Sequence, residues 1–111
     1  MAEFNERDWK LFRSKIAGWQ EDYMGRLNRE YIELLSRDKD PSENFWELYK
    51  RIRTDKRKIG VTISMSRSEM MFDILSLINE GVICFDDLNE FSDELKENVR
   101  STLELFKNRR F

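Results

Sequence analysis

Residues 9–34 read WKLFRSKIAGWQEDYMGRLNREYIEL, and large apolar side chains recur through this stretch at steps of three and four residues. These side chains are Trp9, Phe12, Ile16, Trp19, Tyr23, Leu27, Tyr31 and Leu34. The spacing places them along one side of an α-helix and leaves the charged residues on the others. It predicts one long helix over residues 6–37 with Asn5 as its N-cap. We expect the aromatic residues of this stripe to lie in the core rather than to bind a ligand.

Three further helices follow from start and stop signals in the sequence. DPSE at 40–43 offers an N-cap, a proline at the first helical position and a glutamate for a capping box, which predicts a helix over 41–59 that ends at Gly60. SRSE at 66–69 predicts a third helix over 67–80 that stops at Gly81. A fourth stripe stays in phase across Ser92 and favours one helix over 87–109. The side of the second helix expected to be buried is formed by Phe45, Leu48, Tyr49, Ile52 and Ile59.

The composition fits these helices. A chain of 111 residues has the length of one domain, and one proline and four glycines are too few turn residues for an all-β protein. We therefore expect an all-α, single-domain, four-helix bundle-like fold over residues 1–111, with a long first helix. The β-prone segments 61–63 and 82–84 leave open a short two-stranded ribbon.

The residue types exclude several kinds of chemistry. The chain has no histidine and one cysteine, so it cannot build a Cys/His dyad, a Ser/His/Asp triad or an internal disulfide. Its four glycines lie far apart and form no phosphate-binding loop. The acidic run at 86–94 lacks the spacing of a calcium loop, and acidic residues at a helix start are expected in any case. We expect no enzyme activity, cofactor or metal, and a buried, inert Cys84.

The chain shows no signs of export or of a membrane span. Its first residues contain no apolar run typical of a signal peptide, and no stretch approaches the roughly 20 apolar residues that span a bilayer. With a lone cysteine, these features favour a cytoplasmic location.

A dense run of cations, KRIRTDKRKIG at 50–60, stands out in a chain whose net charge is only −2. On a helix, Lys50, Arg53 and Arg57 align with Trp46, and we call these four residues the basic patch. An aromatic ring beside cations is suited to nucleic acid or to an acidic protein. The alternative is that the cations only solvate a helix end and complement its dipole.

A second candidate surface lies on the back of the first helix. Leu11, Gly18, Gly25 and Ile32 occur every seven residues, and we call this line the seam. Glycine inside a helix costs roughly 1 kcal/mol relative to alanine, so close approach of another helix would explain both glycines. The alternative is that an exposed helix face simply tolerates them.

The sequence carries two resemblances. The segment from Met70 to Leu95, a helix, a glycine stop and a second helix, resembles the short oligomerisation modules called SHOCT. The strings WQEDYMGRLNREYIELL, PSENFWELYKRIRTDKRKIGV and EGVICFDDLNEFSDELKENV resemble a group of small uncharacterised proteins of Gram-positive gut bacteria. Some members of that group carry the label "multidrug transporter", which the lack of a membrane span contradicts. The resemblance implies a bacterial protein of mobile-element or accessory origin.

The sequence therefore predicts a non-enzymatic protein-interaction or regulatory module. Its expected partners are another protein or a second copy of the chain, and it has no evident small-molecule substrate. The alternative is a nucleic-acid-associated protein that uses the basic patch.

Overall fold

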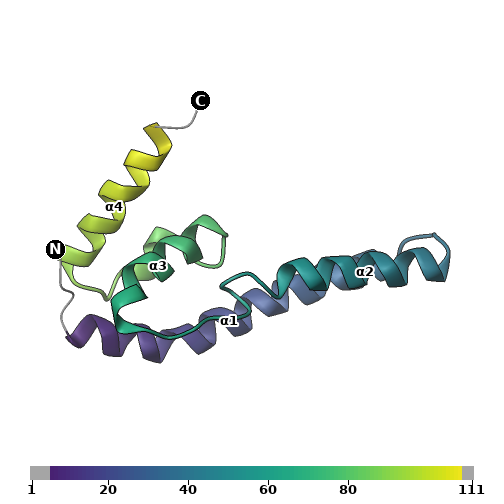
Figure 1. The fold of residues 1–111 in the computed structure, drawn as a ribbon, viewed down its shortest axis with the longest axis horizontal. Helices are drawn as coiled ribbons and strands as arrows, with labels where there is room; N and C mark the ends of the chain where they lie inside the picture. The colour runs from purple at the N-terminus through teal and green to yellow at the C-terminus, as the bar shows by residue number, and fades with distance from the viewer. Residues whose placement is uncertain (1–5, 109–111) are drawn as a thin grey trace.

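The computed structural model describes the backbone of residues 6–108 and the side chains of residues 6–107. Within this range, the chain forms four α-helices: α1 (Glu6–Leu35), α2 (Pro41–Asp55), α3 (Met70–Asn79) and α4 (Asp93–Asn108). Two short 3₁₀ helices, η1 (Arg67–Glu69) and η2 (Phe85–Leu88), precede α3 and α4. The all-α fold with a long first helix is confirmed (Figure 1). Asn5 and residue 109, the expected ends of the first and last helices, lie outside the described residues.

The hydrophobic core lies at one end of the molecule, where α3 and α4 stand on the N-terminal part of α1 (Figure 1). Its fully buried members include Phe12 from α1, Ile74 from α3 and Leu95 from α4. Trp9 and Trp19 pack against this cluster and make ring contacts with Phe12. No residue of α2 belongs to the cluster.

Gly81 ends α3, as predicted. Its φ of 78° is in the left-handed region, which glycine adopts without steric cost. The N–H of Gly81 donates to the carbonyl of Ile78, and the N–H of Val82 donates to that of Leu77. These are the two hydrogen bonds of a Schellman motif. Because Val82 is committed to this cap, the alternative of a two-stranded ribbon is wrong: the described residues contain no strand.

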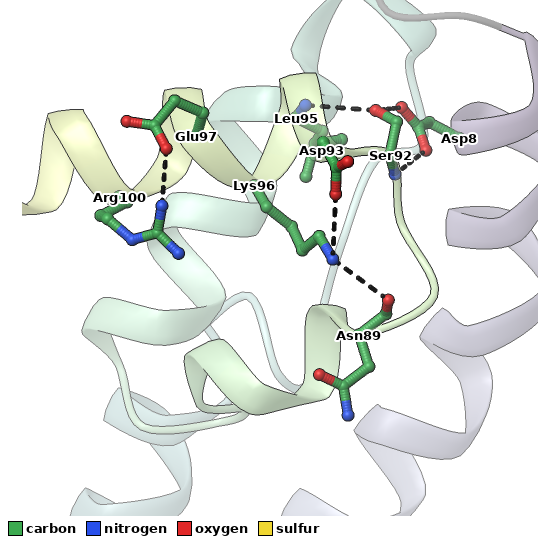
Figure 2. Close-up of polar contacts among 8 residues, drawn as sticks. All are labelled: Asp8, Asn89, Ser92, Asp93, Leu95, Lys96, Glu97 and Arg100. Carbon is green, nitrogen blue, oxygen red and sulfur yellow. Dashed lines mark hydrogen bonds and ion pairs between the residues drawn. The ribbon is translucent and has the colours of Figure 1, made fainter.

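The expected fourth helix over 87–109 is divided in two. η2 ends at Leu88, and α4 begins at Asp93 after a break capped by Ser92. The Ser92 Oγ accepts a hydrogen bond from the N–H of Leu95 at 3.1 Å and donates to Asp8 Oδ2 at 2.6 Å. The Ser92 N–H donates to Asp8 Oδ1 at 2.9 Å. Figure 2 shows how Asp8, fully buried on α1, thereby fixes the start of α4.

α2 ends at Asp55, earlier than predicted, because the carbonyls that follow it bond to the connector instead of continuing the helix. Thr62 Oγ1 and the Lys56 carbonyl are 2.8 Å apart, and the N–H groups of Val61 and Thr62 both donate to the Lys58 carbonyl. Gly60 is not a left-handed cap residue, contrary to the prediction from the sequence. It is buried against the Tyr23 ring and Val82, and a Cβ there would lie 2.7 Å from Val82 Cγ2. Close packing therefore explains this glycine.

The molecule is elongated. Its Cα radius of gyration is 16.9 Å, whereas about 13 Å is usual for a chain of this length. The part of α1 beyond Leu27 and the antiparallel α2 extend past the core as a two-helix hairpin (Figure 1). None of the described helices combines the length and the apolar character that crossing a bilayer requires.

Candidate interaction site

The contact between α1 and α2 is largely polar. The residues that α2 turns toward α1 are Asn44, Leu48, Arg51 and Asp55, spaced by four, three and four residues. Asn44 accepts two hydrogen bonds from Arg37, and Arg51 forms an ion pair with Glu30 at 2.7 Å. Only Leu48 brings an apolar side chain to this stripe.

The contact includes a buried carboxylate at the C-terminal end of α2. Asp55, 4% exposed, accepts a hydrogen bond from the Tyr31 hydroxyl at 2.6 Å and lies near Arg51 and Lys58 at 3.5 and 3.6 Å. Burial and this hydrogen bond raise the pKa of Tyr31, so its hydroxyl keeps the proton that it donates. The hydrogen bond to Glu30 raises the pKa of Arg51. Two contacts therefore cross to α1 and fix the register of α2, the Tyr31–Asp55 hydrogen bond and the Arg51–Glu30 ion pair.

The apolar side of α2 faces solvent, contrary to the prediction that it would be buried. Phe45 is 60% exposed, Tyr49 50% and Ile52 43%. On α1, Ile32 is 63% exposed and Leu35 50%. We call these five residues the apolar face. The polar network around Asp55 occupies the side toward α1, so the apolar stripe can only point elsewhere.

The five residues lie on one side of the hairpin. Phe45, Tyr49 and Ile52 each follow a contact residue of α2 by one position, which turns them by about 100° from α1. Ile32 and Leu35 likewise follow Tyr31 and Leu34, which α1 turns toward α2. Both helices are right-handed and they run antiparallel. A side chain one position after a contact residue therefore points to the same side of the hairpin in both helices. The apolar face is therefore continuous across both helices.

The structure keeps three members of the basic patch on the outer edge of α2 and leaves the fourth outside the helix. Trp46, Lys50 and Arg53 each follow a contact residue by two positions and point away from α1. Because α2 ends at Asp55, Arg57 lies in the turn beyond it, beside the connector to α3, so its predicted place on the same helix is wrong. Trp46 is 59% exposed, and its ring meets those of Phe45 and Tyr49 edge to face. Among the described residues, no ion pair engages Lys50, Arg53 or Arg57, whereas Arg51 and Lys58 are held by Asp55. Lys50 and Arg53 thus form an unpaired positive edge on α2, and Arg57 is an unpaired cation beyond its end.

The structure divides the seam between the core and the surface. Leu11 is partly buried against the core, while Gly18, Gly25 and Ile32 lie toward the outside of α1. A Cβ at Gly18 would meet nothing within 4 Å, and one at Gly25 would reach only Arg29, at 4.0 Å. No other helix of the described chain packs there, so tight packing within the bundle does not explain these glycines.

Other features carry less chemistry. The cleft on the opposite side of the hairpin is lined by four cations and four carboxylates, namely Arg26, Lys50, Arg51, Lys58, Glu30, Glu47, Asp55 and Glu80. Its charges balance, and several are already paired. No group of three or more potential metal ligands comes together within the described residues, the acidic run at 86–94 included.

No known protein guides the assignment. No family model matches the chain, and no curated protein or solved structure is significantly similar to it. The candidate site therefore rests on the geometry of the hairpin.

One further prediction from the sequence, the burial of Cys84, is wrong. Cys84 is exposed rather than buried, because it caps η2 with its backbone N–H bonded to Asp87. The α2 part of the apolar face, Phe45, Tyr49 and Ile52, is evident in the sequence as a stripe, but its expected place was the core. The spacing of Asn44, Arg51 and Asp55 could have corrected this prediction. These polar residues lie on one side of the helix, and that side, rather than the apolar one, packs on α1.

Proposed function

We propose that the protein is a non-enzymatic interaction module whose working surface is the apolar face of the hairpin. The observation that carries this proposal is that five large apolar side chains, together with Trp46, are 43–63% exposed on adjoining surfaces of two helices. Contiguous exposed patches of this kind mark interaction sites in soluble proteins. Phe45 and Tyr49 of this face, with the adjoining Trp46, are aromatic residues, the type enriched at protein interfaces.

The residue inventory supports a binding role rather than catalysis. The sequence lacks histidine, the usual general acid–base group near neutral pH. The cleft of the hairpin is lined by charges that neutralise one another. A regulatory role would act through what the apolar face binds.

The test is affinity capture from a lysate of the native host with three baits. The wild-type chain is compared with a Y49E/I52E variant and with F72E, which changes an exposed aromatic residue on α3. We expect specific partners with the wild type and F72E, and their loss with Y49E/I52E. Capture that is the same with all three baits, or that recovers nothing, contradicts the proposal.

A second candidate function is nucleic-acid binding by the basic patch, which its outward, unpaired cations favour. Lysines and arginines without protein partners are free to neutralise phosphates, and Trp46 offers a ring for stacking. We expect salt-sensitive binding of single-stranded probes, measured by fluorescence anisotropy, and its loss in K50E/R53E/R57E. The matched control is K10E/K39E/K107E, which changes net charge equally at exposed positions elsewhere. Failure to bind any single- or double-stranded probe at low salt removes this candidate.

A further inference from the structure

The apolar face has a complement on the same molecule. The positions of α1 that correspond to the basic patch, two residues beyond its contact stripe, are Gly18, Asp22, Gly25, Arg29, Glu33 and Ser36. This outer edge of α1 protrudes little, because Gly18 and Gly25 have no side chains. It has one more acidic than basic residue. The outer edge of α2 protrudes because of the large Trp46 side chain and carries two cations, Lys50 and Arg53. The flat, acidic edge of α1 and the protruding, basic edge of α2 are therefore complementary in shape and in charge.

We infer that a second copy of the chain covers the apolar face, with α2 of each copy packed along α1 of the other. The inference rests on the proposed function, because it names the occupant of the same surface. A two-fold pair repeats each contact, so a chain that carries both complementary edges satisfies both at once. The result is a four-helix arrangement, the usual way for a helical hairpin to bury an apolar side.

Charge selects this pairing over the alternative in which α2 meets α2. That alternative would place Lys50 and Arg53 of one copy against the same cations of the other. Packing α2 on α1 instead places them near Asp22 and Glu33, which are exposed. Like charges brought together disfavour the first pairing, and complementary charges favour the second.

The available area suits a dimer. A fully buried aromatic side chain removes about 150–250 Å² from water, so Phe45, Trp46 and Tyr49, each at least half exposed, offer on the order of 300 Å². Ile32, Leu35 and Ile52 enlarge this patch, and the polar edges surround it. A standard interface buries about 800 Å² per partner, which this face of the hairpin approaches with its rim. The open space over Gly18 and Gly25 allows a neighbouring helix to come close.

The first experiment measures the oligomeric state by sedimentation velocity across a concentration series to about 200 µM, well above the dissociation constants usual for specific interfaces. We expect the wild type to be dimeric, Y49E/I52E to be monomeric, and F72E to dimerise as the wild type does. All three substitutions are at exposed positions, and circular dichroism checks that each variant is folded. A wild type that stays monomeric, or a dimer that F72E breaks and Y49E/I52E does not, overturns the inference.

The second experiment tests which helices meet. D22K/E33K makes the α1 edge basic, and K50E/R53E makes the α2 edge acidic. We expect each variant alone to dimerise at least ~10-fold more weakly, and an equimolar mixture to form a heterodimer close to wild-type strength. Failure of the mixture to recover association excludes the α1–α2 pairing.

These outcomes separate the inference from the proposed function. If the wild type is monomeric but Y49E/I52E still abolishes capture from the lysate, the face binds a different protein. The proposed function then stands and the self-pairing falls. The self-pairing also falls if the wild type is monomeric and binds nucleic acid, and if K50E/R53E/R57E abolishes that binding.

Discussion

Asp73 on α3 is a buried carboxyl group that lowers the stability of the folded state when it is ionised. Its side chain is 7% exposed, and the Oδ2 atom has no hydrogen-bond partner among the described residues. Burial, with a smaller effect of the nearby Glu69 carboxylate, raises the pKa of Asp73 from 3.8 to about 6. Ionised Asp73 therefore destabilises the folded state, since the charge is better solvated in the unfolded chain.

The sign of this effect gives a pH-dependent prediction. Between about pH 4 and 6 the folded chain binds the proton more tightly than the unfolded chain, so stability falls as pH rises through this window and the penalty is constant above it. D73N cannot ionise, so we expect it to be more stable than the wild type at pH 8, by on the order of 2 kcal/mol, and nearly equal to it at pH 4. Urea unfolding at several pH values measures this difference. Equal stability of both chains at pH 8 would show that Asp73 ionises without penalty.

The elements differ in how well the sequence predicts them, and the reason is whether local signals decide their ends. α1 follows its periodic stripe to within two residues of the predicted end, and Gly81 ends α3 by its own conformation. The break before α4 could not be predicted, because it depends on Asp8, which lies 84 positions from Ser92 in the chain. The apolar stripe of α2 is evident in the sequence, but a stripe does not say what covers it. Here the network of Tyr31, Arg51 and Asp55 decides which side faces α1.

Ser92 joins the start of α4 to Asp8 on α1, and this link gives a testable prediction. S92A removes the hydroxyl that caps α4 and leaves the buried Asp8 carboxylate with one partner fewer. A lost cap costs about 1 kcal/mol and an under-satisfied buried group about 1–3, so we expect a loss of about 2 kcal/mol or more. Chemical denaturation measures it, and S101A, an exposed serine in the same helix, is the control. A loss no larger than that of S101A would mean that the link between α1 and α4 contributes little.

At the scale of the whole molecule, stability is distributed unevenly. The core cluster draws on α1, α3, α4 and the segment between α3 and α4, while the hairpin relies on polar contacts and on the limited burial of Leu34 and Leu48. Regions with few buried apolar contacts open locally at lower free energy than the core. The candidate interaction site thus lies on the less stable part of the fold.

This distribution predicts a concentration-dependent pattern of hydrogen exchange. In dilute protein, amides of α2 should exchange faster than those of α3. If a second copy covers the apolar face, protection of α2 should rise with protein concentration, because binding stabilises the closed hairpin, while that of α3 changes less. Y49E/I52E serves as the control and should show no such dependence. Exchange of α2 that is independent of concentration in the wild type would contradict self-pairing.

The tryptophans are divided between the two parts of the molecule. Trp9 and Trp19 pack beside Phe12 at the core, and Trp46 stands half exposed on the hairpin. An indole ring emits at shorter wavelength when it leaves water, and iodide quenches those rings that solvent reaches. Intrinsic fluorescence therefore contains two signals. Emission from the core pair follows unfolding, and emission from Trp46, isolated by comparison with W46F, follows whatever comes to lie on the hairpin, without any attached label.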